Sequence, residues 1–331
     1  MSYEIQEFRL PAAELEEVAD FLADFVGDGE LPDGSELDAN PAVWSKRLSH
    51  WWTSNPFSRV DTPLGFVLRL QETNQIVGFQ GFIPQDYVKG GEVIPGLIST
   101  TFFVRESQRS AALGMMMRLK RLSQRFHLVD GTPSGEVRAI LDRLGFQKTG
   151  TGAQRYRIVP LVRLATLGRR ENLQGFHVVL DPMEARSIPT PETSKLQKHV
   201  TREGLAWFIR SGSQPLCFAG LCDDSGRLCA YFIANTKSKF GLLSARVMES
   251  ASFDADGAGL LRLANFASRE PGQCGLPPKT SVVAWTSLNG GFRPDWLIRR
   301  SWSTHLYHLS PSSLRDTEKV AQPSEGDSML L

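Results

Sequence analysis

The chain has 331 residues, 41% of them hydrophobic and 22% charged, which is typical of a folded, water-soluble protein of about two domains. No run approaches the ~20 apolar residues of a membrane span, and the N-terminus lacks the basic start and apolar core of an export signal. We therefore expect a cytoplasmic protein without membrane contact. The formal net charge of only +1 argues against a nucleic-acid-binding protein.

Charge is nevertheless distributed unevenly along the chain. Residues 1–40 carry twelve acidic side chains and one arginine, whereas residues 101–170 carry fourteen lysines or arginines and four acids. The near-neutral total is therefore a cancellation between an acidic start and one basic block. The basic block favours a phosphorylated ligand. The acidic start is either a solvated surface or a rim that attracts a cationic molecule such as an amine.

Strand and helix patterns alternate through the first half of the chain. Residues 3–9 alternate like a short strand, and four apolar side chains recur at helical spacing between Leu15 and Phe25, which predicts a helix over residues 11–27. The elements predicted after a loop at 28–40 are a helix at 44–52, strands at 65–70, 76–83 and 97–104, a helix at 109–125, a strand at 126–129, a helix at 134–144 and a strand at 153–159.

The second half repeats this order of elements. It is predicted to contain strands at 215–221, 228–234 and 242–247, a helix at 258–269 and a strand at 281–288. Matched elements are offset by about 145–150 residues, which indicates duplication of one α/β unit. We therefore expect an α/β fold with mixed α+β sheets. Its predicted parts are a first domain at 1–165, a linker at 166–200, a second domain at 201–310 and a disordered tail at 311–331.

The four cysteines follow no CxxC pattern, and three of them lie in apolar, strand-like surroundings. Neither a zinc site nor a disulfide framework is expected from this arrangement. We predict no metal cofactor.

The most informative stretch joins the strand that ends at Val104 to the following helix. This helix begins with the small residues Ser110, Ala111 and Ala112, which leave its first N–H groups uncovered. Uncovered N–H groups and the helix dipole both favour an anion at this place. Arg109 adds a bidentate donor. The stretch therefore predicts a binding site for a phosphate or pyrophosphate.

Two motifs resemble those of the GCN5-related N-acetyltransferases (GNATs). Arg109-x-x-Ala112-x-Gly114, after an apolar strand, is similar to the loop with which this family holds the pyrophosphate of acetyl-coenzyme A. Leu144-Gly145-Phe146, at the end of a helix, is similar to the family's second motif. The resemblance covers residues 1–160 and extends to 200–310 in architecture only. It implies two tandem acyl-CoA N-acyltransferase-like domains, of which the second is degenerate.

The resemblance also implies a reaction and a set of binding residues. The reaction is transfer of an acyl group, usually acetyl, from acyl-CoA as co-substrate directly to a primary amine. Backbone groups at the end of the strand would pair with the pantetheine arm, and the following loop would hold the pyrophosphate. The binding residues carried over in this way are Phe103, Val104, Arg109, Ser110, Ala111, Ala112, Leu113 and Gly114.

Departures from the family pattern leave the catalytic groups open. Leu141 stands where many members carry a tyrosine general acid, and the strand at 97–104 contains no carboxylate for a general base. The candidates for the proton-accepting role are Asp86 or a water held by Ser99 and Thr100. In the second half Asp256 precedes the corresponding helix and would repel a pyrophosphate.

Two other functions remain compatible with the sequence. The same fold could take its acyl or aminoacyl group from an acyl carrier protein or an aminoacyl-tRNA, and the basic side chains between Arg118 and Arg125 would then steer the donor. Alternatively, the chain could be a catalytically degenerate binding or assembly module. The acceptor is expected to be a small amine, and its identity, like the oligomeric state, is left open.

Overall fold

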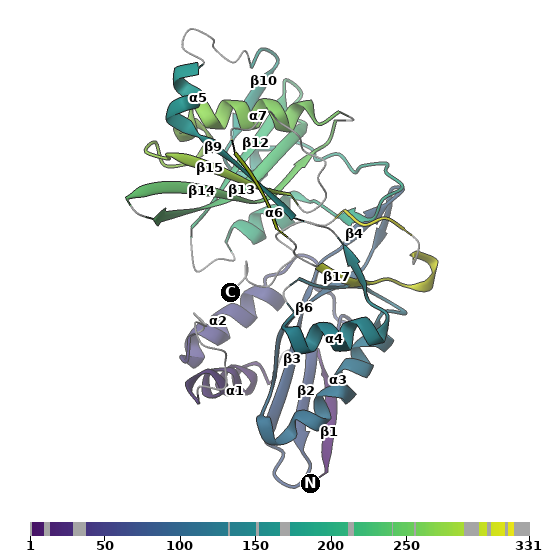
Figure 1. Ribbon diagram of the computed structural model, residues 1–331. Coiled ribbons are helices and arrows are strands. Elements are labelled where there is room, and N and C mark those ends of the chain that lie inside the picture. The colour runs from purple at the N-terminus through teal and green to yellow at the C-terminus, as the bar shows by residue number, and fades with distance from the viewer. Residues whose placement is uncertain are drawn as a thin grey trace.

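The computed structural model describes residues 2–9, 14–28, 38–131, 133–149, 152–165, 173–210, 215–239, 241–254, 256–287, 298–302, 306–314 and 317–320. Within these ranges the chain forms two seven-stranded mixed sheets and one three-stranded sheet. The two large sheets lie at opposite ends of the molecule, each with its own helices (Figure 1). The mixed α/β architecture expected from the sequence is therefore confirmed.

The first sheet has the order β1-β2-β3-β6-β7-β17-β8. Side chains alternate across it, so Leu97 packs toward one pair of helices and Ile98 toward the other pair. Helices α1 and α2 cover one face, and α3 and α4 cover the other (Figure 1). The bounds in this half are β1 Tyr3–Phe8, α1 Leu15–Gly27, α2 Pro41–Trp52, β2 Gly65–Leu70, β3 Ile76–Pro84, β4 Tyr87–Lys89, β5 Glu92–Ile94, β6 Gly96–Val104, η1 Glu106–Gln108, α3 Arg109–Leu122, β7 His127–Asp130, α4 Gly135–Leu144 and β8 Gln147–Thr149.

The second sheet has the order β10-β12-β13-β14-β15-β9-β16. Helix α7 packs on one of its faces, and the other face joins the core of the first half, where Tyr231 and Trp52 belong to one cluster. The bounds are β9 Gly152–Ile158, α5 Val159–Ala165, β10 Phe176–Val179, η2 Pro182–Glu184, β11 Gln197–Lys198, α6 Arg202–Ile209, β12 Leu216–Asp223, β13 Leu228–Lys239, β14 Leu242–Ser252, α7 Ala258–Arg269, η3 Pro271–Cys274, β15 Val282–Ser287, β16 Ile298–Trp302, β17 Leu306–Leu309 and η4 Ser312–Leu314.

The two halves exchange one strand each. Strand β9, expected to be the last strand of the first half, lies in the second sheet between β15 and β16. Strand β17, from the end of the chain, lies in the first sheet between β7 and β8. The expected boundary near residue 165 therefore does not separate the strands of the two sheets. Alternation in a sequence identifies a strand, whereas its partner is chosen by the tertiary structure.

Part of the segment expected to be a disordered tail is built into the fold. The backbone N–H of Val320 donates to the carbonyl of Leu196, and Lys319 is 3% exposed with its ammonium 5.1 Å from the centre of the Tyr87 ring. Within the expected tail, residues 311–314 and 317–320 are thus placed in the structure, and Lys319 packs on Tyr87. Residues 315–316 and 321–331 lie outside the described residues.

Across the helices that the structure describes, none combines the length and the apolar character needed to cross a membrane.

Candidate active site

The first sheet forks in its middle. Strands β6 and β7 pair in parallel only from Gly96 to Ser99, and β6 then continues to Val104 paired with β3 but not with β7. At the same place the pairing of β6 with β3 shifts register, and Thr101 has a left-handed backbone with φ of 44°. This combination is a β-bulge, which bends a strand away from its neighbour. It leaves the β7-side edge of residues 100–104 without a strand partner among the described residues.

Helix α3 begins directly beyond the fork. Its N-terminus has no side-chain cap and no acidic residue in the first turn, which favours an anion through the helix dipole. The short helix η1 precedes it directly, and the backbone N–H of Arg109 donates to the carbonyl of Glu106. Arg109 and Ser110 are exposed there, and Arg109 makes no ion pair within the part of the chain that the structure describes. The loop predicted from the sequence thus directly follows the segment of β6 that no longer pairs with β7.

The small residues of this helix do not all face the same way. Ala111 is buried in the core, and Gly114 lies against β1, where an added Cβ would come 3.0 Å from Cδ1 of Ile5. These two residues allow α3 to pack closely on the sheet. The side chains that remain available to a ligand are those of Arg109, Ser110 and the 55%-exposed Leu113.

The three candidate catalytic residues lie in three different surroundings. Ser99 accepts a hydrogen bond of 3.2 Å from Nε2 of Gln80. The Thr100 hydroxyl is buried without a hydrogen-bond partner. Asp86 lies beyond the end of β3 and forms an ion pair of 2.6 Å with Arg59. The fold therefore brings Ser99 and Thr100 to the fork and leaves Asp86 about four residues, or roughly 13 Å of strand, beyond it.

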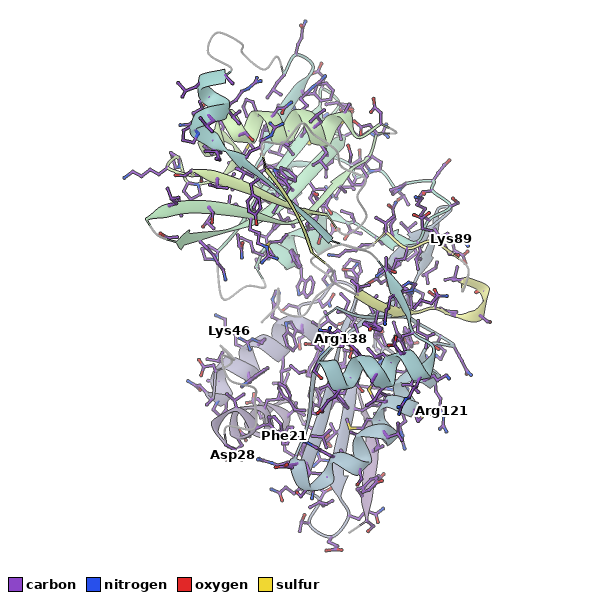
Figure 2. The ribbon with its side chains drawn as sticks, in the orientation of Figure 1. Phe21, Asp28, Lys46, Lys89, Arg121 and Arg138 are labelled. Carbon is purple, nitrogen blue, oxygen red and sulfur yellow. The ribbon has the colours of Figure 1, made fainter. Side chains whose placement is uncertain are left out.

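Aromatic side chains pack between α1 and the end of β6. Phe103 stacks on Phe25 with ring centres 4.9 Å apart, and the Arg105 guanidinium lies over the rings of Phe21 and Phe25. Arg105 also pairs with Asp28 at the end of α1; Phe21 and Asp28 are labelled in Figure 2. Sequence reasoning missed this aromatic cluster, although helical spacing already put Phe25 on the buried side of α1.

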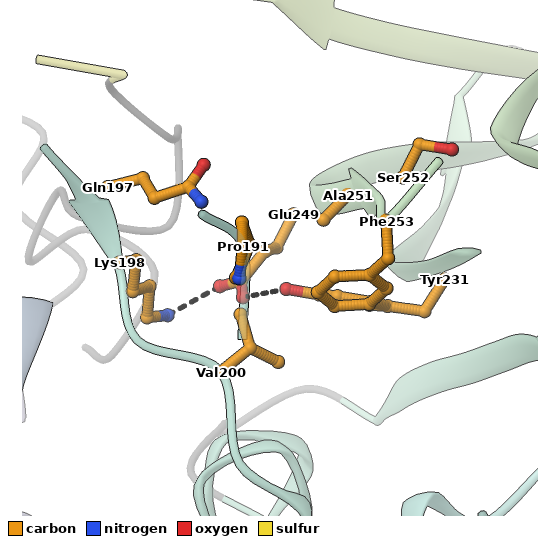
Figure 3. Close-up of a pocket in the computed structure, with 9 residues that line it drawn as sticks. All are labelled: Pro191, Gln197, Lys198, Val200, Tyr231, Glu249, Ala251, Ser252 and Phe253. Atoms are coloured by element: carbon orange, nitrogen blue, oxygen red, sulfur yellow. Dashed lines mark hydrogen bonds and ion pairs between the residues drawn. The ribbon is translucent and has the colours of Figure 1, made fainter. Parts of the chain in front are cut away.

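A second fork occurs in the second half. Strands β14 and β15 pair in parallel only from Ser244 to Val247, and a bulge follows before Glu249. Glu249 therefore stands at the position that matches Thr101. Its carboxylate accepts hydrogen bonds from Nζ of Lys198 at 2.5 Å and from Oη of Tyr231 at 2.6 Å (Figure 3). Burial and the Glu249 charge raise the pKa of Tyr231 well above its usual value, which keeps its hydroxyl protonated as a donor.

The second fork is closed by the chain's own groups. The cavity beside Glu249 has a volume of about 30 Å³, which holds no more than one or two waters. At the N-terminus of α7, Asp254 accepts from the N–H of Gly259 at 2.5 Å and Asp256 accepts from the N–H of Ala258 at 3.1 Å. Carboxylates thus occupy the place that a pyrophosphate would need. The sequence predicts that Asp256 would repel a pyrophosphate, and in the structure its carboxylate lies at the start of α7.

Comparison with solved structures places this architecture. A GCN5-related N-acetyltransferase from Anabaena variabilis matches over 93% of this chain and 72% of its own, with a TM-score of 0.59 and 9% identity. An Enterococcus faecalis protein described as a "Probable N-Acyltransferase" matches over 94% of this chain and 73% of its own, with a TM-score of 0.58 and 12% identity. The chain has the GNAT fold. A GCN5-related N-acetyltransferase from Kribbella flavida also matches, over 92% of this chain and 71% of its own, with a TM-score of 0.53 and 10% identity.

Comparison by sequence gives no match, either to a family model or to a curated protein. The GNAT fold is present twice, because both halves carry a forked sheet, a bulge after the fork and a helix beyond it. Ser99 and Val247 end the parallel pairing in the two halves and are separated by the offset seen in the sequence. The resemblance read from the two motifs is thus confirmed at the level of the fold.

Proposed function

We propose that this chain is an N-acyltransferase that binds acyl-CoA, such as acetyl-CoA, in its first half and transfers the acyl group to a primary amine. The observation that carries the proposal is the uncapped N-terminus of α3, with Arg109 beside it, at the mouth of an open fork. A pyrophosphate there would receive backbone N–H groups, the helix dipole and a guanidinium. The free backbone edge of Phe103 and Val104 would receive the pantetheine arm.

The second half supports the proposal by contrast. Its fork and helix are built in the same way, but Lys198, Tyr231 and two aspartates satisfy the groups that a donor would need. We therefore assign donor binding to the first half alone. The second half serves to cover the acceptor side of the first sheet, where its core is continuous with that of α1 and α2.

Direct transfer fits the chemistry of the cysteines. Burial raises the pKa of all four thiols, that of Cys222 to about 11, so none is disposed to form the thiolate of an acyl-enzyme. In the proposed reaction the amine nitrogen attacks the thioester carbonyl carbon, and the C–S bond breaks. Coenzyme A leaves as a thiolate and takes up a proton, while the amine's proton passes to water beside Thr100. Asp86 is less suited to this role because Arg59 occupies its carboxylate.

Calorimetric titration with acetyl-CoA tests the assignment of the donor site. Arg109→Ala should weaken binding about 10- to 100-fold, since it removes a charge-assisted contact to phosphate. Arg121→Ala is the matched control, because this exposed arginine lies at the other end of the same helix (Figure 2). Absence of binding of any acyl-CoA to the unaltered protein, or equal effects of the two variants, contradicts the proposal.

A carrier-bound donor is a second candidate, favoured by the exposed face of α3. Leu113 and Met117 are 55% and 42% exposed and lie one turn apart between arginines, an arrangement that suits an acidic helix of a partner protein. The same titration with an acylated carrier protein in place of acetyl-CoA separates the two donors. Tighter binding of the carrier would favour this candidate.

A further inference from the structure

Three residues at the bulge between β3 and β6 have a buried side-chain polar atom without a partner among the described residues. The atoms are Oε1 of Gln80, Oγ1 of Thr100 and Oγ1 of Thr101, in side chains that are 1%, 2% and 4% exposed. A buried polar atom without a hydrogen bond costs free energy, and native structures contain few of them. Gln80 faces α3, where its amide nitrogen contacts Ser99 and Met116, whereas Thr100 and Thr101 lie together beside Gly81. The two adjacent hydroxyls therefore indicate a place where a bound molecule supplies the missing partners.

Thr101 is the most unusual of these residues. Among the described residues only Asn74 and Thr101 combine a side chain with a positive φ, and Asn74 belongs to a hairpin turn. A β-branched residue in the left-handed region is strained, and such strain is concentrated at binding sites. Gly81 makes the conformation possible, because a Cβ there would lie 2.7 Å from Oγ1 of Thr101.

The position of Thr101 decides which part of a donor it could meet. The same space beside Gly81 is bounded by Phe79, which faces α1 and α2, so the Thr101 hydroxyl lies on that face of the sheet. The predicted pyrophosphate site lies at the start of α3, which covers the opposite face. A pantetheine arm held there and passing through the fork would bring its thioester end to the side of Thr101.

We propose that the Thr101 hydroxyl donates a hydrogen bond to the thioester carbonyl of the bound acyl donor; this rests on the proposed acyl-CoA function. The hydroxyl polarises the carbonyl toward attack by the amine and stabilises the negative charge that develops on the oxygen. Oγ1 of Thr101 is buried in this structure, so the proposed contact requires the donor to displace atoms that cover it. At the second fork the matching residue, Glu249, has its partners within the chain and needs no ligand.

The test compares variants with and without this hydroxyl. Thr101→Val keeps the shape and removes the hydroxyl, whereas Thr101→Ser keeps the hydroxyl. We expect Thr101→Val to bind acetyl-CoA about tenfold more weakly, as loss of one hydrogen bond predicts, while its unfolding temperature without donor stays equal or rises. Thr280→Val is the control, because this equally buried hydroxyl already donates to the carbonyl of Pro277 at 2.6 Å. It should lower the unfolding temperature and leave donor binding unchanged.

A spectroscopic measurement makes the test independent of affinity and folding yield. In isotope-edited infrared spectra, the carbonyl stretch of ¹³C-labelled acetyl-CoA should shift to lower frequency on binding to the unaltered protein and to Thr101→Ser. This shift should be smaller with Thr101→Val. Equal shifts with serine and valine at position 101, or no shift in the unaltered protein, overturn the proposal even when acetyl-CoA binds. Failure of acetyl-CoA to bind the unaltered protein instead refutes the proposed function itself.

Discussion

At the scale of single residues, two buried histidines lie on neighbouring strands of the first sheet, close to Lys319. His127 and His308 are 0% and 5% exposed, and their ring centres are 5.7 Å apart. Burial lowers the pKa of His127 well below its usual value and that of His308 to about 3, and the nearby Lys319 charge adds to both effects. Both imidazoles are therefore neutral in the folded protein, whereas in the unfolded chain they titrate near pH 6.5.

These two histidines predict a loss of stability in acid. Because the unfolded state binds the protons more readily, their contribution is fully present above pH ~6.5 and is lost as the pH falls toward the folded pKa values. The slope should be about 1.4 kcal/mol per pH unit for each histidine. Urea unfolding at pH 7, 6 and 5 measures it. His308→Gln should remove one histidine's share, and the exposed His177→Gln should change nothing; equal slopes in all three proteins contradict the prediction.

At the scale of elements, local signals predicted helices α1 to α4 and α7 and the longer strands, but not α5, α6 or short strands such as β4 and β5. The Asn40 side chain caps α2, Ser134 caps α4, and Gly145 ends α4 in the left-handed conformation; such end signals lie within a few residues of the element. The loop and the helix at Arg109 were predictable because their signals are also local. The bulge at Thr101 was not, because no glycine marks it and its cause, the divergence of β6 from β7, is not local.

Side-chain roles at the candidate site were predictable only in part. The sequence predicted Arg109 to be part of an anion site, and in the structure this side chain is exposed at the start of α3. It could not reveal that Arg59 pairs with Asp86, because the two residues are brought together by the fold. Nor could it reveal that Lys198 closes the second fork, because the ion pair with Glu249 joins a linker to a strand fifty-one positions later.

At the scale of the whole molecule, the strand exchange makes the two halves dependent on each other. Strand β17 completes the first sheet and buries Leu306, Tyr307 and Leu309 to 8% exposure or less. Burying each such side chain contributes about 1.5–3 kcal/mol, which together is comparable to the net stability of about 5–15 kcal/mol of a typical domain. Strand β9 fills the equivalent place in the second sheet. Neither half contains all the strands of its own sheet.

A split chain tests this dependence. The fragments 1–169 and 170–331 divide the chain between α5 and β10, so the cut interrupts no helix or strand of the described residues. Each fragment alone lacks one internal strand and carries one that belongs elsewhere, so each should fail to give a cooperative urea transition. Expressed together, they should co-purify and unfold in a single transition, because each supplies the strand that the other lacks. If fragment 1–169 alone unfolds cooperatively, β17 is dispensable and the first half is an independent domain.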